Sequence, residues 1–233
     1  MKTTLIIPTL NEIEGVKAIL PRIKPEWCDQ IIIVDGNSTD GTAEFVKEQG
    51  YLVISQKEKG LRRAYLEALP YIEGDIVITF SPDGNSVPEL IPLLIEKMKE
   101  GYDMVIVSRY LEGAKSDDDT FITALANKVF TLTTNLFFGG KYTDAMVIYR
   151  AYKKELIPAL DLDKDSSFWL GEKLIGKTMS WEMLLSIRAA KRKLKVAEIP
   201  GDEPGRIDGA VKMQWRWGFA YILQMFREVF FWR

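Results

Sequence analysis

Short apolar runs alternate with segments of helical period through the first half of the chain. The run at residues 31–34 is apolar on both of its faces, which is typical of a strand that helices cover on both sides. The predicted strands are 4–8, 31–34, 52–55, 76–80 and 104–108, and the predicted helices between them are 14–23, 42–49, 61–69 and 88–100. This alternation predicts an α/β fold, with a mostly parallel sheet flanked by helices.

The second half of the chain is less regular. A polar, acidic stretch at 113–120 predicts a mobile loop. The elements expected after it are a helix at 121–138, a strand at 144–152, a helix at 182–192, a strand at 194–199 and a final helix at 214–233. We therefore expect one large domain over residues 1–211, followed by an aromatic, amphipathic C-terminal helix over residues 212–233.

The composition narrows the kinds of metal site open to the chain. Its 233 residues include no histidine and a single cysteine, Cys28. The usual nitrogen and sulfur ligands of zinc are therefore missing, and a metal on oxygen ligands is favoured, namely Mg²⁺ or Mn²⁺. The formal net charge of −2 supplies no basic field, so no nucleic-acid partner is expected.

Polar turns follow three of the predicted strands. Asn11 and Glu12 follow the first, Asp35 follows the second, and Asp83 and Asn85 follow the fourth. Open parallel sheets bind nucleotides at this carboxyl edge. We therefore expect Glu12 and Asp35 to bind the nucleoside of a nucleotide diphosphate sugar. Asp83 and Asn85 are expected to bind the metal that neutralises its diphosphate.

These turns carry the motifs of a known family: Pro-Thr-Leu-Asn-Glu at 8–12, Val-Asp-Gly-Asn-Ser-Thr-Asp-Gly-Thr at 34–42 and Ser-Pro-Asp at 81–83. In this order the sequence resembles the family 2 glycosyltransferases of the GT-A fold. The resemblance implies a nucleotide-sugar site that includes Pro8, Glu12 and Asp35. Residues 81–83 stand at the family's D-x-D motif, whose first Asp is missing here, so Asp83 is its only carboxylate.

Within that family the sequence most resembles the dolichyl- and polyprenyl-phosphate mannosyltransferases, on segments 108–110, 143–152, 196–200 and 205–212. In that subfamily the basic residues of these segments contact phosphate. The resemblance therefore implies that Arg109, Arg206 and Lys212 bind the phosphate of the donor or of the acceptor. The acceptor loop of the subfamily is basic, whereas residues 117–119 of this chain are all aspartate.

These features predict an inverting glycosyltransferase that moves a sugar to a polyprenyl phosphate, with metal-bound Asp83 aiding departure of the diphosphate. The alternative acceptor is a hydroxyl of a glycan or lipid, which needs a general base. In other branches of the family an acidic pair precedes a helix of the L-x-x-R type, and this resemblance implies Glu182 as the base; Asp144 is the other candidate. A phosphate acceptor is already a nucleophile and needs no base. An alternative of another class is a non-catalytic, membrane-associated module that binds nucleotide sugars, which the incomplete D-x-D motif suggests.

Aromatic residues crowd the C-terminal helix: Trp215, Trp217, Phe219, Tyr221, Phe226, Phe230, Phe231 and Trp232. Such a helix suits a membrane interface, and the alternative is packing against the domain or against a second copy of the chain in a homo-oligomer. No signal peptide or membrane-spanning run is evident. The expected location is cytoplasmic, peripheral on the inner face of the membrane.

Overall fold

A seven-stranded sheet forms the centre of the part of the chain that the computed structural model describes, residues 1–176, 179–207, 215–230 and 232. The strand order is β3-β2-β1-β4-β6-β5-β7. β6 runs antiparallel to β4 and β5, and the other neighbouring pairs are parallel. The strands are β1 (Thr3–Thr9), β2 (Gln30–Asp35), β3 (Leu52–Ser55), β4 (Ile76–Thr79), β5 (Met104–Ser108), β6 (Arg150–Lys153) and β7 (Val196–Pro200). The predicted mostly parallel sheet is confirmed.

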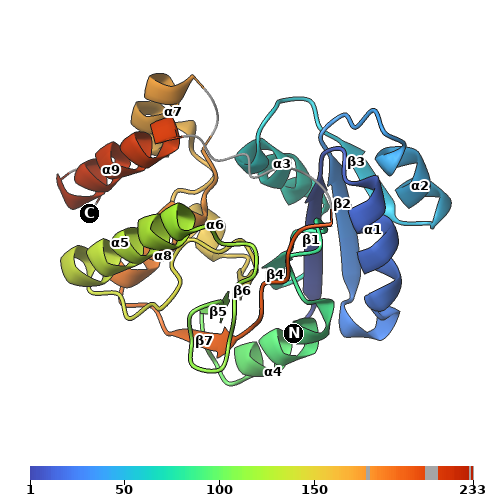
Figure 1. The fold of residues 1–233 in the computed structure, drawn as a ribbon, viewed down its shortest axis with the longest axis horizontal. Coiled ribbons are helices and arrows are strands. Elements are labelled where there is room, and N and C mark those ends of the chain that lie inside the picture. Colours follow the sequence, from blue (N-terminus) through green and yellow to red (C-terminus); the bar gives the residue numbers. More distant parts are fainter. Residues whose placement is uncertain (177–178, 208–214, 231, 233) are drawn as a thin grey trace.

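Helices cover both faces of this sheet, as the doubly apolar strands predict (Figure 1). Leu5 and Ile7 of β1 belong to the core beneath α1, α2 and α4, whereas Ile6 belongs to the core beneath α3, α5, α6 and α8. The helices are α1 (Ile13–Ile19), α2 (Thr42–Glu48), α3 (Leu61–Ala68), α4 (Ile91–Lys99), α5 (Phe121–Phe138), α6 (Leu156–Ala159), α7 (Trp169–Ile175), α8 (Glu182–Lys191) and α9 (Trp215–Phe230).

The prediction of a strand over residues 144–152 is wrong for most of its length. β6 begins only at Arg150, and the residues before it form an irregular, bent segment. The buried Arg150 guanidinium explains the difference, because it donates to the carbonyl oxygens of Ala145 (3.3 Å) and Val147 (2.9 Å). These side-chain hydrogen bonds stabilise the bent path of the segment. The short helices α6 and α7 were not predicted.

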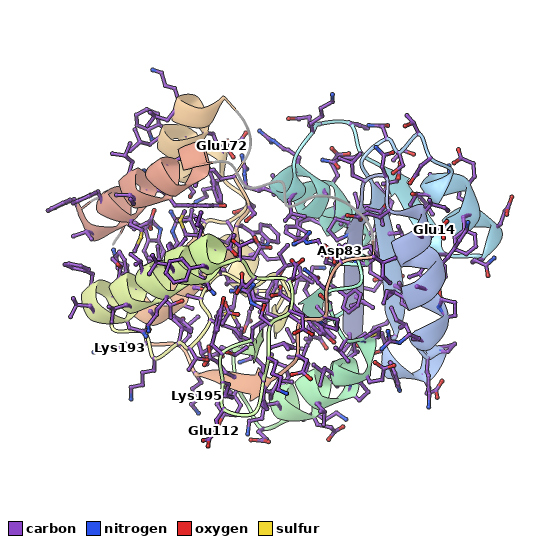
Figure 2. The ribbon with its side chains drawn as sticks, in the orientation of Figure 1. Glu14, Asp83, Glu112, Glu172, Lys193 and Lys195 are labelled. Carbon is purple, nitrogen blue, oxygen red and sulfur yellow. The ribbon has the colours of Figure 1, made fainter. Side chains whose placement is uncertain are left out.

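A buried arginine attaches α7 to the rest of the fold. The Arg62 side chain of α3 is fully buried, and its Nε and Nη2 atoms donate to Glu172 Oε1 at 3.0 and 2.8 Å. Glu172 lies on α7, where Figure 2 labels it. Arg62 also donates to Asp165, the first residue of a short 3₁₀ helix before α7 (2.8 Å). Such long-range pairs leave no pattern along the sequence, which explains why α7 was missed.

The C-terminal helix α9 packs against the domain through one of its faces. Arg188 of α8 and Glu228 of α9 form a two-pronged ion pair, both bonds 2.9 Å long, between fully buried side chains. Trp232 is also buried, under the Arg188 guanidinium, so it does not belong to an exposed aromatic belt. Within the described residues no helix is long and apolar enough to cross a membrane. The predicted boundary between residues 211 and 212 lies outside them.

Candidate active site

The loop after β2 holds Asp35 in a fixed position. Its carboxylate is 3% exposed, and Oδ2 accepts the backbone N–H groups of Asn37 and Ser38, both at 3.0 Å. Asn37 adopts a positive φ of 65°, which turns the chain back over the carboxylate. Asparagine tolerates this conformation better than most residues. Asp35 is therefore placed before any ligand binds.

The loop after β1 lies against the loop after β2. Asn11 accepts the Thr39 N–H at 2.8 Å, and the Glu12 N–H donates to the Thr42 hydroxyl at 3.1 Å. Pro8 pairs with Val34 across the strands that lead into these loops. The structure thus brings together Pro8, Glu12 and Asp35, the residues assigned to the donor, at the carboxyl edge of β1 and β2.

Asp83 follows β4 at the same edge, near the centre of the molecule (Figure 2). Gly15 of α1 permits this placement, because an added Cβ there would overlap the Pro82 carbonyl oxygen. The Asp83 carboxylate is 3% exposed, and its Oδ1 accepts the Asn85 N–H at 3.3 Å. Burial raises the pKa of the Asp83 carboxyl above its usual value, against the opposing effect of Arg206.

Arg206 links Asp83 to the acidic segment. Its Nη1 donates to Asp83 Oδ2 at 2.7 Å, and its Nε donates to Asp118 Oδ2 at 2.8 Å. The backbone holds the two segments together, because the Ile207 N–H donates to the Asp83 carbonyl at 2.7 Å. One guanidinium therefore bridges two carboxylates that come from different loops.

Arg109 lies among carboxylates at the end of β5. It pairs with Asp144 through Nε (2.6 Å) and Nη2 (3.1 Å), and its Nη1 reaches Glu203 at 3.1 Å and Asp119 at 3.9 Å. Burial alone would raise the pKa of the Asp144 carboxyl, but the Arg109 ion pair and a hydrogen bond from Asn127 lower it overall. Asp144 is therefore a charged partner of Arg109.

The acidic segment at residues 117–119 is attached to the site, although the sequence predicted a mobile loop there. Ser116 and Glu203 form a parallel bridge, with the Glu203 N–H donating to the Lys115 carbonyl and the Asp117 N–H donating to the Glu203 carbonyl, both at 2.8 Å. Asp119 accepts the Tyr110 hydroxyl. The attachment has an electrostatic reason: the arginines beside this segment attract its carboxylates.

Glu182 lies apart from this cluster, at the start of α8. Its side chain is 1% exposed, and Oε1 accepts the Tyr65 hydroxyl at 2.9 Å. Tyr65 stacks on Trp181, with ring centroids 4.8 Å apart. Glu182 Oε2 has no hydrogen-bond partner among the described residues. The predicted base is therefore enclosed in the core beneath α3 and α8.

The sequence analysis did not identify Glu203, and it assigned Lys212 to phosphate. Glu203 is 6% exposed and contacts Arg109, Ser116 and, at 3.5 Å, the Asn85 amide. Its only signal was a carboxylate shortly after the last strand, the same signal that identified Asp35 and Asp83. Lys212 lies outside the described residues.

A pocket of about 400 Å³ opens beside Arg109 at the start of α5. Its polar side is lined by Arg109, Tyr110, Lys115, Ser116, Asp119 and Thr120, and Phe121 lines the side toward α5. A larger pocket of about 650 Å³ lies near Asp75 and Ile76, at the opposite end of β4 from Asp83. The smaller pocket is therefore the one that belongs to the predicted site.

The donor atoms around Asp83 suit a hard divalent cation. The Asp83 carboxylate already binds a positive group, the Asn85 amide oxygen lies two residues on, and the Asp118 carboxylate faces the same guanidinium. All of these ligands are oxygens, as Mg²⁺ and Mn²⁺ prefer. No group of three or more cysteine or acidic side chains placed to hold a metal occurs in the described part of the chain. A metal here would therefore draw its remaining ligands from the donor diphosphate or from water.

Comparison with known proteins identifies the family of the chain. The profile of "Glycosyl transferase family 2" matches residues 4–160, which include the Asp35, Asp83, Arg109 and Asp144 positions. The chain belongs to this family. The resemblance seen in its motifs is thereby confirmed.

Curated relatives are similar over most of the chain. A dolichol-phosphate mannosyltransferase of Pyrococcus furiosus is 27% identical over 97% of this chain, and this chain spans 63% of that protein's length. An undecaprenyl-phosphate mannosyltransferase of Micrococcus luteus is 27% identical over 94% of this chain and 95% of its own. A polyprenol monophosphomannose synthase of Mycolicibacterium smegmatis is also 27% identical, over 91% of this chain and 81% of its own.

Solved structures confirm the GT-A fold. A glucosyl-3-phosphoglycerate synthase from Mycobacterium tuberculosis, in complex with Mn²⁺, UDP and glucosyl-3-phosphoglycerate, superimposes with a TM-score of 0.68 over 98% of this chain and 80% of its own. Another structure of that synthase, with Mg²⁺ and UDP, has a TM-score of 0.69 over 98% of this chain and 79% of its own. Their sequence identities of 17% and 18% support the fold alone.

Proposed function

We propose that the chain is an inverting glycosyltransferase that moves a sugar from a nucleotide diphosphate sugar to a polyprenyl phosphate. One observation carries the choice of acceptor: the pocket beside Arg109 opens at the start of α5, and the exposed face of α5 is apolar along its length except at Lys128. An acceptor with an anionic head and a long apolar tail fits both features. The names of the curated relatives agree with this choice.

The donor half of the site rests on the loops after β1, β2 and β4. Glu12 and Asp35 bind the nucleoside, and Asp83 with Asn85 holds Mg²⁺ or Mn²⁺. Such a metal, when bound, neutralises the charge that develops on the departing diphosphate. The synthase that shares this fold was crystallised with Mn²⁺ or Mg²⁺ and UDP, which supports the assignment. Arg206 and Lys212 are assigned to phosphate.

The exposed face of α5 supplies the apolar half of the acceptor site. Its side chains are between 50% and 82% exposed, and they are Phe121, Ile122, Leu125, Val129, Leu132, Leu136 and Phe137. These positions follow the spacing of one helix face. An apolar surface of this length is uncommon on a soluble protein and marks an interaction site.

A phosphate acceptor also agrees with the positions of the two residues available as a base. Glu182 is enclosed behind Tyr65, and Asp144 is held by Arg109, so neither carboxylate is positioned for a hydroxyl in this conformation. A phosphate oxygen attacks without a base. Attack on the anomeric carbon from the face opposite the diphosphate then inverts its configuration.

The same apolar face is proposed to rest on a membrane. α5 and α9 lie near one another on the side of the molecule away from α1 and α2 (Figure 1). α9 adds exposed Ile222, Phe226, Val229 and Phe230. The chain is then a peripheral protein of the cytoplasmic leaflet, and burial of this face in a homo-oligomer is the competing outcome.

A transfer assay tests the acceptor. With an active nucleotide sugar and Mn²⁺, we expect transfer to polyprenyl phosphate, and Arg206→Ala should reduce its rate by about 100-fold or more, since a charge-assisted contact is lost. Glu182→Gln should change the rate little. A large Glu182 effect would instead favour a hydroxyl acceptor, for which loss of a base costs roughly 10²–10⁴ in rate.

Vesicle flotation tests the membrane surface. The double variant Leu132→Ser/Leu136→Ser should lose most binding to anionic vesicles, because both side chains lie on the exposed face of α5. Leu93→Ser is the matched control, since Leu93 is 54% exposed on α4, on the other face of the sheet. Binding that is equal in all three proteins, or a dimer that the double variant dissociates, would reject the membrane assignment.

A further inference from the structure

We propose that Arg206 is a displaceable counter-cation for Asp83: the guanidinium and the divalent metal occupy this carboxylate alternately, and the nucleotide diphosphate drives the exchange. The inference rests on the proposed function, because it describes how the same donor site is regulated. It concerns a step that precedes sugar transfer, and it is therefore open to measurement without transfer.

Both oxygens of the Asp83 carboxylate are occupied. Oδ1 accepts the Asn85 N–H at 3.3 Å, and Oδ2 accepts Arg206 Nη1 at 2.7 Å. Ser81, which stands at the position of the missing D-x-D carboxylate, also forms a hydrogen bond with Asp83. A metal that binds Oδ2 must therefore compete with the Arg206 guanidinium for that oxygen.

Arg206 is the partner that is able to leave. The Asn85 N–H belongs to the turn that Asp83 itself forms, whereas Arg206 reaches Asp83 from a segment 123 residues away in the sequence. The Arg206 side chain is 28% exposed, so part of it already faces solvent, whereas Asp83 is buried. Its backbone does not need to follow, because the Ile207 N–H bond to the Asp83 carbonyl holds the segment in place.

The Arg206 guanidinium and the divalent metal exclude one another at Asp83, because both are positively charged. A guanidinium and a divalent cation at the same buried carboxylate repel one another strongly, because burial weakens the screening by water. The diphosphate of the donor offers the guanidinium a second anionic partner that it is able to bind with two parallel bonds. Arg206 then moves from Asp83 to the diphosphate as the metal takes Asp83.

Asp118 holds the Arg206 guanidinium in its position on Asp83. Its Oδ2 accepts Arg206 Nε at 2.8 Å, so the guanidinium is bound at both of its edges. The acidic segment, which is unexpected next to a phosphate site, acquires a role in this way: it keeps the arginine on Asp83 while no donor is present. Loss of the Asp118 charge should loosen this hold and make metal binding easier.

Mn²⁺ titration tests the proposal directly, with the full chain, no nucleotide and free Mn²⁺ followed by electron paramagnetic resonance. Arg206→Gln should bind Mn²⁺ about tenfold more tightly than the wild-type chain, because the competing cation is gone. Asp118→Asn should bind it about two- to fivefold more tightly, since only the anchor is lost. Arg22→Gln is the matched control, because Arg22 pairs with Glu89 away from the site, and it should not change the affinity.

Added nucleoside diphosphate, UDP or GDP in parallel, supplies the second readout. It should strengthen Mn²⁺ binding in the wild-type chain more than in Arg206→Gln, because only the wild type has a guanidinium to remove. Asp83→Asn should remove the difference between the two chains.

Three results would overturn the proposal: Mn²⁺ binding in Arg206→Gln that is no tighter than in the wild type, weaker binding in Asp118→Asn, or a difference that persists in the Asp83→Asn background. Weaker binding in Asp118→Asn would make Asp118 a metal ligand instead. Because the titration contains no sugar donor and no acceptor, its outcome is separate from that of the transfer assay. Asp118→Asn also leaves the test valid if Arg206→Gln fails to fold.

Discussion

The site holds its charged groups in two opposite ways. Its donor edge consists of the loops after β1 and β2, and its ion-pair edge consists of Arg109, Arg206 and the carboxylates around them. Asp35, on the donor edge, is bound by backbone N–H groups of its own loop. Arg109 and Arg206, on the ion-pair edge, are bound by carboxylates from distant segments. Backbone contacts fix a group before the ligand arrives, whereas ion pairs are exchangeable. The donor edge is therefore preformed, and we expect the ion-pair edge to exchange partners when phosphate binds.

The largest effect on the rate of sugar transfer is expected at Asp83, where the two edges meet. Asp83→Ala should reduce metal-stimulated transfer by about 10²–10³-fold, the range for loss of one group that stabilises transition-state charge. Rates with and without chelator measure this. Asp75→Ala, at the opposite end of β4, is the control. Full activity of Asp83→Ala in chelator would show that Asp83 does not belong to the site.

A smaller effect is expected at Asp35, on the preformed edge. Asp35→Asn loses charge-assisted hydrogen bonds of about 1.5–3 kcal/mol, so donor affinity should fall by about 10- to 100-fold while the fold persists. Calorimetric titration with the nucleotide sugar measures it, with Asp29→Asn before β2 as the control. An unchanged affinity would show that the preformed loop does not bind the donor.

The ion-pair edge is tested at Asp144 through the stability of the folded protein. Its pKa is lowered in the folded protein, chiefly by the Arg109 pair acting against burial. The pair therefore stabilises the fold above the ordinary carboxyl pKa of 3.8, and this contribution is lost as the pH falls through the lower folded value. Asp144→Asn should reduce the free energy of unfolding by about 1–2 kcal/mol at pH 7.

Melting curves across pH check the Asp144 prediction. The wild-type chain and Asp144→Asn should converge as the pH falls below the ordinary carboxyl pKa. A constant difference at every pH would mean that the variant loses packing and not an ion pair.

The smallest effect is expected at Asp119, which is 3.9 Å from Arg109. Asp119→Asn removes one charge that competes with the acceptor phosphate, so the KM for polyprenyl phosphate should fall about two- to fivefold, as suits a single partly exposed pair. The KM for the donor should not change. A higher KM for the acceptor would make Asp119 an acceptor contact and would contradict the exchange model of this edge.

The sequence by itself determined most strands, most helices and the strand-end positions of the donor-edge carboxylates. The bounds of α5 and the positions of Asp35 and Asp83 agree with the apolar periods and the strand-end turns. These signals are local: a strand and the turn after it span only a few residues, and parallel strands carry such turns to one edge.

Only the tertiary structure decided which charges meet and which apolar face remains exposed. Arg206 reaches Asp118 and Asp83 across 88 and 123 residues of sequence, and no local pattern encodes a contact of that separation. The stripe from Phe121 to Phe137 has the spacing of a core-facing helix. It faces outward because the other side of α5, with Phe130 and Phe138, packs on the domain, and that choice depends on the elements around α5.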